Sequence, residues 1–488
     1  MTSPDAEELT TPLTSNPYAH VHTSSGFAVE DMSDDIDLIP ATRLKAAHNA
    51  SLPVTRLPDD VLQAIFELEA EEIPRVTRTK SDIRSVAYQI DITHVCRRWR
   101  RLALLTPSLW CKLRLDHDQD VVMATRIISQ CTESLSLELR ISDLGVFIGE
   151  GGVRCSLWRV SPELSPLLRS FLEKHLHKIC TLSIGACKHT LPIFFRDEYP
   201  VAERLTSLVV QDSTCEDART PLPWPYHVSR LVAPHLHTLR IEGIDLPLHI
   251  VDSATLRTVS TRGRSWDRLS TPSDLLSELA GLSHVENLRY AITNLRPPVT
   301  HWPAQRLELP RLRSLHIEGD VQSSILSPYQ MARFILAIHM PNLVHLSMSQ
   351  LPQGYGSQES LMQILSSVPK VVSLSIEFDR DALLALLSGL VEVGPGTQTP
   401  LLPQLQRIDL CLTQPLNFTD SFPHYPLLSA VEEMAMVRRV TGTGIALLER
   451  LSMAPDLPIR TVDRLRQMGL SVGRLQSNFL DIEEVSVS

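Results

Sequence analysis

Apolar residues recur along the chain with two different spacings, and the change falls near residue 110. In segment 57–74, Leu62, Ile65 and Phe66 stand three and four residues apart, the spacing of one helix face. Pro58 suits the first turn of such a helix, and Pro74 ends it. A second segment carries a similar apolar stripe, formed by Ile92, Val95, Cys96, Trp99 and Leu102. These patterns predict two amphipathic helices before residue 110.

Beyond residue 110 a strand-like motif repeats, with leucine or another apolar residue at the first, fourth and sixth positions. It occurs at 179–184, 205–210, 236–241, 256–261, 285–290, 312–317, 343–348, 371–376 and 405–410. The fourth positions are about 28 residues apart on average, within the range of leucine-rich repeat units. Segments 109–115 and 135–141 are predicted as the first two strands. Helical spacing appears between strands at 165–179, 271–282, 327–341 and 360–369.

The alternation predicts an α/β repeat fold, a leucine-rich-repeat-like solenoid preceded by a small all-α helical unit. Residues 1–50 are rich in Ser, Thr and Asp and poor in large apolar groups, which predicts a disordered tail. We therefore divide the chain into this tail, a helical domain at 51–112, a repeat array at 113–440 and a C-terminal cap and tail at 441–488. Segment 462–472 is predicted as one last helix over the end of the array.

A target-binding surface follows from strand alternation. The leucines of each motif point inward, so the residue between the last two points to the opposite, concave face. We predict that target-binding residues on this face are Arg240, Glu242, Arg289, His316, Glu318, Ser347, Ser375 and Asp409. Such a mixed, mostly polar face suits a protein partner rather than a nucleic acid. Plain solvation remains the competing interpretation for any single position, because few residues dominate an interface.

Composition and charge restrict the class of protein. The chain has 488 residues, 43% hydrophobic and 21% charged, which is ordinary for a soluble globular protein. Its net charge of −10 disfavours nucleic-acid binding, so the arginines at 97–101 are interpreted as the solvated back of a helix. No apolar run is long enough to cross a bilayer, and no membrane partner is expected. Eight cysteines without a Cys-x-x-Cys motif favour a reducing compartment, cytoplasmic and/or nuclear.

The sequence shows no motif for catalysis or for a cofactor. The segment "GEGG" at 149–152 lacks the Lys-Ser/Thr of a phosphate loop and is interpreted as a turn. His235 and His237 flank an inward leucine and are predicted as exposed strand positions, not as metal ligands. The pair His175 and His177 and the group Cys180, Cys187 and His189 are further metal candidates; Cys180 is better explained as a packed thiol. We expect no enzyme, metal or cofactor.

Three blocks in the helical segment carry a resemblance to a known family. "LPDDVLQAIF", "VCRRWRRLA" and "PSLW" resemble the F-box, and most closely the F-box families of mushroom-forming fungi. Asp60 replaces the usual glutamate, and the gap between Phe66 and Val95 is longer than in the compact motif. The resemblance implies a Skp-family adaptor as partner and, through it, a cullin. The positions that match the motif are Leu57, Pro58, Leu62, Ile65, Val95, Cys96, Trp99 and Leu102.

Two interpretations of these apolar residues remain open. A unit this small has more large apolar groups than its own core needs, so some should form an exposed partner site. Alternatively, they pack on the first repeats. The resemblance implies the substrate-recognition subunit of an SCF-type cullin–RING ubiquitin ligase. A protein-interaction scaffold of the same architecture, outside any ligase, is the alternative.

Overall fold

The computed structural model describes most of the chain from residue 47 to residue 474. The described residues are 47–48, 51–72, 92–130, 135–142, 144, 163–187, 190–196, 198–212, 230–244, 246–252, 254–262, 272–291, 306–319, 328–349, 357–378, 380–391, 401–412, 425–438, 446–454 and 459–474. The predicted N-terminal tail (apart from residues 47–48), the "GEGG" turn and the last residues after 474 lie outside them. The chain divides into two units, Met1–Pro58 and Asp59–Ser488. The first contains the short 3-10 helix η1 (Pro53–Arg56).

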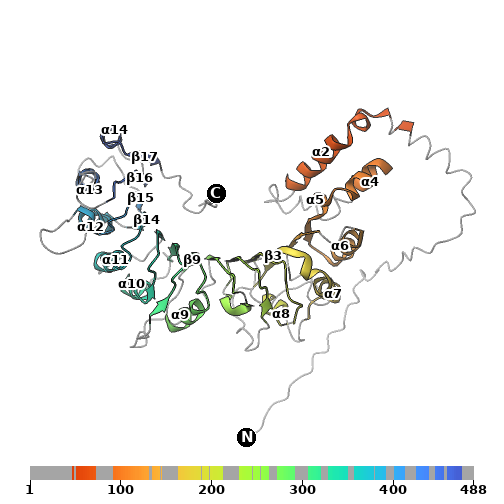
Figure 1. The fold of residues 1–488 in the computed structure, drawn as a ribbon, viewed down its shortest axis with the longest axis horizontal. Helices are drawn as coiled ribbons and strands as arrows, with labels where there is room; N and C mark the ends of the chain where they lie inside the picture. The colour runs from red at the N-terminus through yellow and green to blue at the C-terminus, as the bar shows by residue number, and fades with distance from the viewer. Residues whose placement is uncertain are drawn as a thin grey trace, which may run out of the picture. The chain divides into compact units, whose positions relative to one another are not determined.

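Within the described residues of the second unit, 13 strands form one sheet, and neighbouring strands pair in parallel. Their spatial order follows the chain (Figure 1). The strands are β1 (Lys112–Leu115), β2 (Leu137–Ile141), β3 (Ile179–Ala186), β4 (Ser207–Asp212), β6 (Thr238–Glu242), β8 (Thr258–Arg262), β9 (Asn287–Ala291), β11 (Ser314–Glu318), β13 (His345–Ser349), β14 (Ser373–Phe378), β15 (Arg407–Leu412), β16 (Arg450–Ala454) and β17 (Ser471–Arg474). Two small parallel pairs stand apart from it: β5 (Leu231–Val232) with β7 (Val251–Asp252), and β10 (Leu307–Glu308) with β12 (Ile338–His339).

Helices connect successive strands and pack on one another. They are α6 (Asp118–Gln130), α7 (Pro166–His175), η3 (Leu176–Lys178), α8 (Leu191–Phe194), η4 (Leu248–Ile250), α9 (Pro272–Ala280), α10 (Pro328–Leu336), α11 (Ser357–Ser366), α12 (Arg380–Val391), α13 (Tyr425–Val437) and α14 (Ile459–Gln467). Figure 1 shows them along one side of the sheet. We call the opposite side, which carries the alternate side chains of the strands, the sheet face.

The core lies between the sheet and the helices and is built from the predicted leucines. Leu288, Leu315, Leu346 and Leu374 are register partners on four neighbouring strands, and each is at most 2% exposed. Leu239 occupies the same row on β6, two strands before β9. The prediction of a parallel, solenoid-like α/β sheet is therefore confirmed. Each strand buries its leucines only because its neighbours do the same.

The sheet continues beyond residue 440, where the repeat array was predicted to end. Strand β16 pairs with β15, and β17 pairs with β16. The prediction of one helix over 462–472 is wrong at its C-terminal end, because α14 ends at Gln467 and β17 begins at Ser471. Gly469 has a φ of +74°, and Leu470 N–H donates to the Leu465 carbonyl. This left-handed glycine ends the helix and returns the chain to the sheet.

The helices before the sheet differ from the prediction at one point. Helix α2 (Asp59–Glu72) is present, but the second predicted helix is interrupted at Cys96 between a helical turn at 92–95 and α4 (Arg97–Leu104). Cys96 is extended (φ −159°, ψ 170°), and its Sγ accepts the Trp99 N–H at 3.4 Å. The thiol thereby caps the N-terminus of α4. The sequence pattern predicts Cys96 on the apolar face of a continuous helix instead. A short helix, α5 (Pro107–Trp110), then leads directly into β1.

Candidate functional site

We call α2, residues 92–95, α4 and α5 the helical head. Its interior contains Leu62 and Phe66 of α2, at 0% and 1% exposure. The Phe66 ring packs edge-on against Trp99 of α4, with centroids 5.1 Å apart. Trp110 is buried and donates its Nε1–H to the Ala103 carbonyl at 2.7 Å. Two predicted adaptor-binding residues, Leu62 and Trp99, therefore face the interior of the head.

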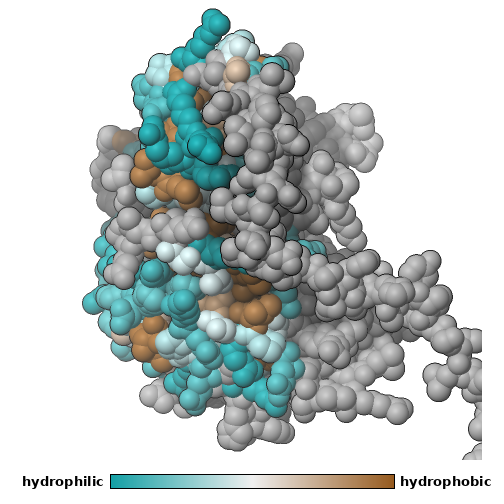
Figure 2. All heavy atoms as spheres, turned by 90° about the vertical axis from the view of Figure 1, so that its right-hand side faces the viewer, coloured by the Kyte–Doolittle hydropathy of each residue, from teal (hydrophilic) through white to brown (hydrophobic). Residues whose placement is uncertain are grey.

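The other side of α2 carries an exposed apolar stripe. Val61, Ile65 and Leu68 stand at i, i+4 and i+7 and are 40%, 39% and 62% exposed. We call these three residues the head stripe. Figure 2 views the side of the molecule that carries α2, and shows apolar patches among polar side chains there. Grouped apolar side chains on a protein surface mark a contact with a partner more often than scattered ones do.

The remaining predicted adaptor-binding residues have mixed environments. Val95 is exposed, whereas Cys96 and Leu102 are half-buried. In the first unit, Leu57 is half-buried and Pro58 is exposed. The structure thus places Ile65 and Val95 outward and adds Val61 and Leu68, which the sequence interpretation missed. The available signal was that α2 has apolar residues on two faces rather than one.

The arginine-rich side of α4 connects it to α2. Arg98 forms an ion pair with Asp59 at 2.6 Å, and Arg101 approaches the same carboxylate at 3.9 Å. The Ser108 hydroxyl donates to Glu67 at 2.9 Å. These contacts are exposed, so each adds at most about 1 kcal/mol, but together they orient α4 and α5 against α2.

The predicted target-binding residues form a continuous row on the sheet face. Register partners on neighbouring strands follow in order: Arg240, Ser260, Arg289, His316, Ser347, Ser375 and Asp409. The row extends to Arg114 and Arg140 on the first two strands and to Ser452 on β16, none of which the prediction included. Glu242 and Glu318 stand two residues further along their strands, on the same face.

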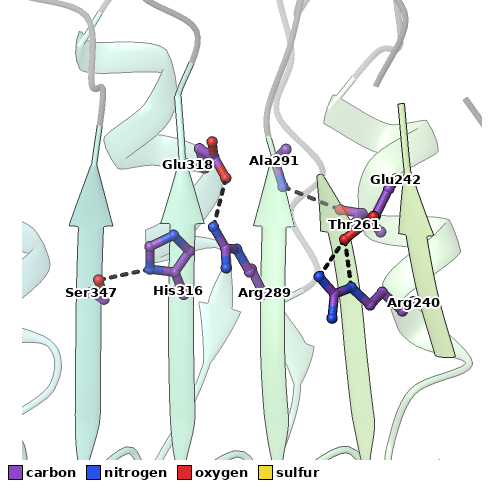
Figure 3. Close-up of polar contacts among 8 residues, drawn as sticks. All are labelled: Arg240, Glu242, Thr261, Arg289, Ala291, His316, Glu318 and Ser347. Atoms are coloured by element: carbon purple, nitrogen blue, oxygen red, sulfur yellow. Dashed lines mark hydrogen bonds and ion pairs between the residues drawn. The ribbon is translucent and has the colours of Figure 1, made fainter. Parts of the chain in front are cut away.

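Hydrogen bonds and ion pairs organise the middle of this row (Figure 3). Arg240 is paired with Glu242, which also accepts a hydrogen bond from Gln211 at 3.1 Å. Arg289 donates to Glu318 at 3.2 Å from the neighbouring strand. Because these groups hold one another in place, the face presents charges in fixed positions.

His316 is buried although its strand position places it on the sheet face. It is 8% exposed, as is Ser347, and the His316 Nδ1 lies 2.7 Å from the Ser347 Oγ. Burial lowers the pKa of His316 to about 4, with further lowering from Arg289 and Arg262, so the ring is neutral at pH 7. His316 and Ser347 thus occupy the predicted row of the sheet face, but little of either side chain is exposed. Elsewhere in the row, Arg240 is exposed, and Ser375 and Asp409 are half-buried.

Protonation of a second buried histidine should lower stability in acid. His175 of α7 is 4% exposed and packs on Phe171, and burial, with nearby Lys174 and Lys178, lowers its pKa from 6.5 to about 4. The stability that depends on its neutral form is fully present above pH 6.5, falls steadily as pH drops from 6.5 towards 4, and is gone below about 4. We expect His175→Gln to remove about 2 kcal/mol of the difference in unfolding free energy between pH 7 and pH 5, measured in urea.

The exposed His177 supplies the matched control for this measurement. His177→Gln makes the same substitution at an exposed position two residues away and should leave the wild-type pH dependence in place, since it keeps the buried His175 ring. Equal pH dependence in wild type and His175→Gln would contradict the assignment.

The metal candidates do not converge in the described part of the chain, where no group of three His, Cys, Asp or Glu side chains could hold an ion. The Cys180 thiol donates to the Leu137 carbonyl at 3.2 Å, and the Cys187 N–H and thiol both donate to the Thr190 hydroxyl in the turn before α8. His235 and His237 precede β6 and are not strand residues, and His189 lies outside the described residues. None of the described helices has both the length and the apolar character needed to span a bilayer.

The fold and its surfaces define an α/β, solenoid-like protein with a 13-stranded parallel sheet across its described strands and a helical head. Comparison with protein-family models finds no match, and comparison with curated proteins finds none either. We therefore infer function from the residues and contacts above.

Proposed function

We propose that this chain is the substrate-recognition subunit of an SCF-type cullin–RING ubiquitin ligase. In this proposal the helical head acts as an F-box and binds a Skp-family adaptor. The sheet face of the leucine-rich-repeat-like array binds a target protein. The single observation that carries it is the head stripe. Val61, Ile65 and Leu68 expose apolar surface within the segment that resembles the F-box.

One face of α2 packs in the core of the head, which leaves the other face available to bind a partner. Leu62 and Phe66 are used internally, so the head does not need the opposite face for its own core. Leu104 and Leu105 at the end of α4 are also exposed, at 37% and 69%. Exposed apolar side chains on the helices of a small unit are typical of the dry centre of a protein interface.

The sheet face supports the second half of the proposal. Its side chains come from many strands, and their positions depend on a continuous buried ladder rather than on single loops. A rigid surface loses little conformational entropy when it binds a partner. Arginines and carboxylates from several strands both occur on it, which favours a protein partner with complementary charges.

The mechanism would be proximity. The chain would perform no chemistry, but would raise the effective concentration of the target near the ubiquitin-transfer machinery. Both partners are proteins in this scheme, with neither nucleic acid nor membrane involved. We further propose that it acts in the cytoplasm, the nucleus or both.

Co-purification tests the proposal. Tagged full-length protein should recover a Skp-family adaptor and a cullin together, and removal of the adaptor should also remove the cullin. Recovery of the adaptor without the cullin would favour an interaction scaffold outside the ligase. Recovery of neither would contradict the proposed function.

A further inference from the structure

Three nitrogen-bearing side chains lie on consecutive strands in the middle of the sheet face. Arg262, Arg289 and His316 come from the consecutive strands β8, β9 and β11. Arg289 and His316 are direct register partners, and both arginines are close enough to influence the protonation of His316. We call these three residues the central cluster; Figure 3 shows Arg289 and His316 side by side.

The central cluster has an excess of positive charge. Glu318 neutralises Arg289, and Glu242 is engaged by Arg240 and Gln211. Among the described residues Arg262 has no ion-pair partner. The whole chain carries a charge of −10, so this local excess is opposite in sign to the rest of the protein. A negatively charged ligand is therefore attracted to this position specifically.

Two buried nitrogens of the central cluster lack a hydrogen-bond partner among the described residues: Arg289 Nε and His316 Nε2. His316 is 8% exposed, and its other ring nitrogen is already engaged by Ser347. When the Ser347 hydroxyl donates to Nδ1 of the neutral ring, Nε2 carries the hydrogen. Buried N–H groups are nearly always hydrogen-bonded, so two on adjacent strands indicate an acceptor supplied by a ligand.

The acceptor that fits is an oxyanion. A carboxylate accepts several hydrogen bonds and is the usual partner of an arginine fork, whereas a cation would be repelled by both arginines. Arg240, with 52% of its side chain exposed, lies in the same row two strands from Arg289. Adjacent strands are about 4.8 Å apart, so two strands separate these arginines by about 9.6 Å. A ligand segment in the extended polyproline-II conformation rises about 3.1 Å per residue and has three residues per turn, so carboxylates at every third residue would lie on one side of it at about that spacing.

We propose that Arg262, Arg289 and His316 form a carboxylate-binding site for an extended acidic segment of the target. The inference rests on the proposed function of the sheet face, and it specifies the chemistry of the segment that is recognised. Arg262 contributes the unneutralised charge, Arg289 and His316 contribute N–H donors, and Arg240 binds a second carboxylate of the same segment.

Fluorescence anisotropy with full-length protein tests this site. The probe is a labelled 12-residue peptide with glutamate at every third position and serine and glycine elsewhere. A matched peptide has glutamine in place of each glutamate. We expect the glutamate peptide to bind at least about 10-fold more tightly, and its affinity to fall as salt is raised.

Arg262→Gln should weaken binding of the glutamate peptide about 10-fold, because it removes an arginine that forms no ion pair with Glu242, its register partner, or with any other described carboxylate. Arg126→Gln on α6 makes the same charge change on an exposed helix, and should alter affinity less than about 2-fold. A double variant, Arg262→Gln with Arg289→Gln, should reduce binding to the level of the glutamine peptide.

Equal affinity for both peptides, or equal loss in Arg262→Gln and Arg126→Gln, would overturn the site. The outcome is separable from the proposed function, because the peptide assay contains no adaptor or cullin. Loss of the peptide preference with normal recovery of adaptor and cullin rejects only this site. A retained preference without adaptor binding rejects only the ligase assignment.

Discussion

Replacing Ile65 and Leu68 together by glutamate should abolish recovery of the Skp-family adaptor and lower its affinity at least about 100-fold. Each side chain would bury apolar surface worth about 1.5–3 kcal/mol in a complex, and each glutamate would also have to lose its hydration. Both residues are exposed in the chain alone, so its fold should be unchanged. Isothermal titration with purified adaptor measures the affinity, and circular dichroism measures the fold.

Val122 on α6 provides the matched control. It is 38% exposed, close to the value for Ile65, but it lies outside the helical head. Val122→Glu should leave adaptor binding within about 2-fold of wild type. If the head-stripe variant still binds the adaptor as tightly as Val122→Glu does, the head stripe is not the adaptor site.

Leu374→Ala should lower the free energy of unfolding by about 3 kcal/mol. Leu374 is fully buried and lies in register between Leu346 and Ile408 on the neighbouring strands. Truncation removes apolar contacts with both neighbours and leaves a cavity that the ladder cannot close without moving strands. Urea denaturation followed by far-UV circular dichroism measures the change.

Ser375, the next residue of β14, is the control for this prediction. Its side chain lies on the sheet face and is half-buried. Ser375→Ala should change the unfolding free energy by less than about 0.5 kcal/mol, since it leaves the leucine ladder intact. Similar losses for the two variants would show that the ladder is not the source of stability.

Strand positions were largely predictable, because leucine spacing is a local property. The motif at 312–317 corresponds to β11, although the strand itself begins at Ser314. Leu312 lies in the turn before it, where its N–H donates to the Leu309 carbonyl at 3.2 Å, yet its side chain is fully buried. The same signal exists in the missed strand β16, where Leu448, Leu451 and Met453 have the spacing of the motif.

The candidate sites were only partly predictable. The row from Arg240 to Asp409 follows from alternation along each strand, and the structure brings those residues into register. The pairing of Arg289 with Glu318, and of His316 with Ser347, depends on which strands become neighbours. The break at Cys96 was not predictable from periodicity, since the thiol cap replaces a helical hydrogen bond at that residue.

The sequence by itself determined a series of strands with one apolar and one polar face, because the side chains of a strand alternate and the inner ones must be covered. Only the tertiary structure decided which face of α2 is interior and which forms the head stripe, because both faces are apolar and the choice depends on packing with α4 and α5. Tertiary structure also decided that His316 is buried and neutral, because its solvation and its charged neighbours come from residues about 30 or more positions away.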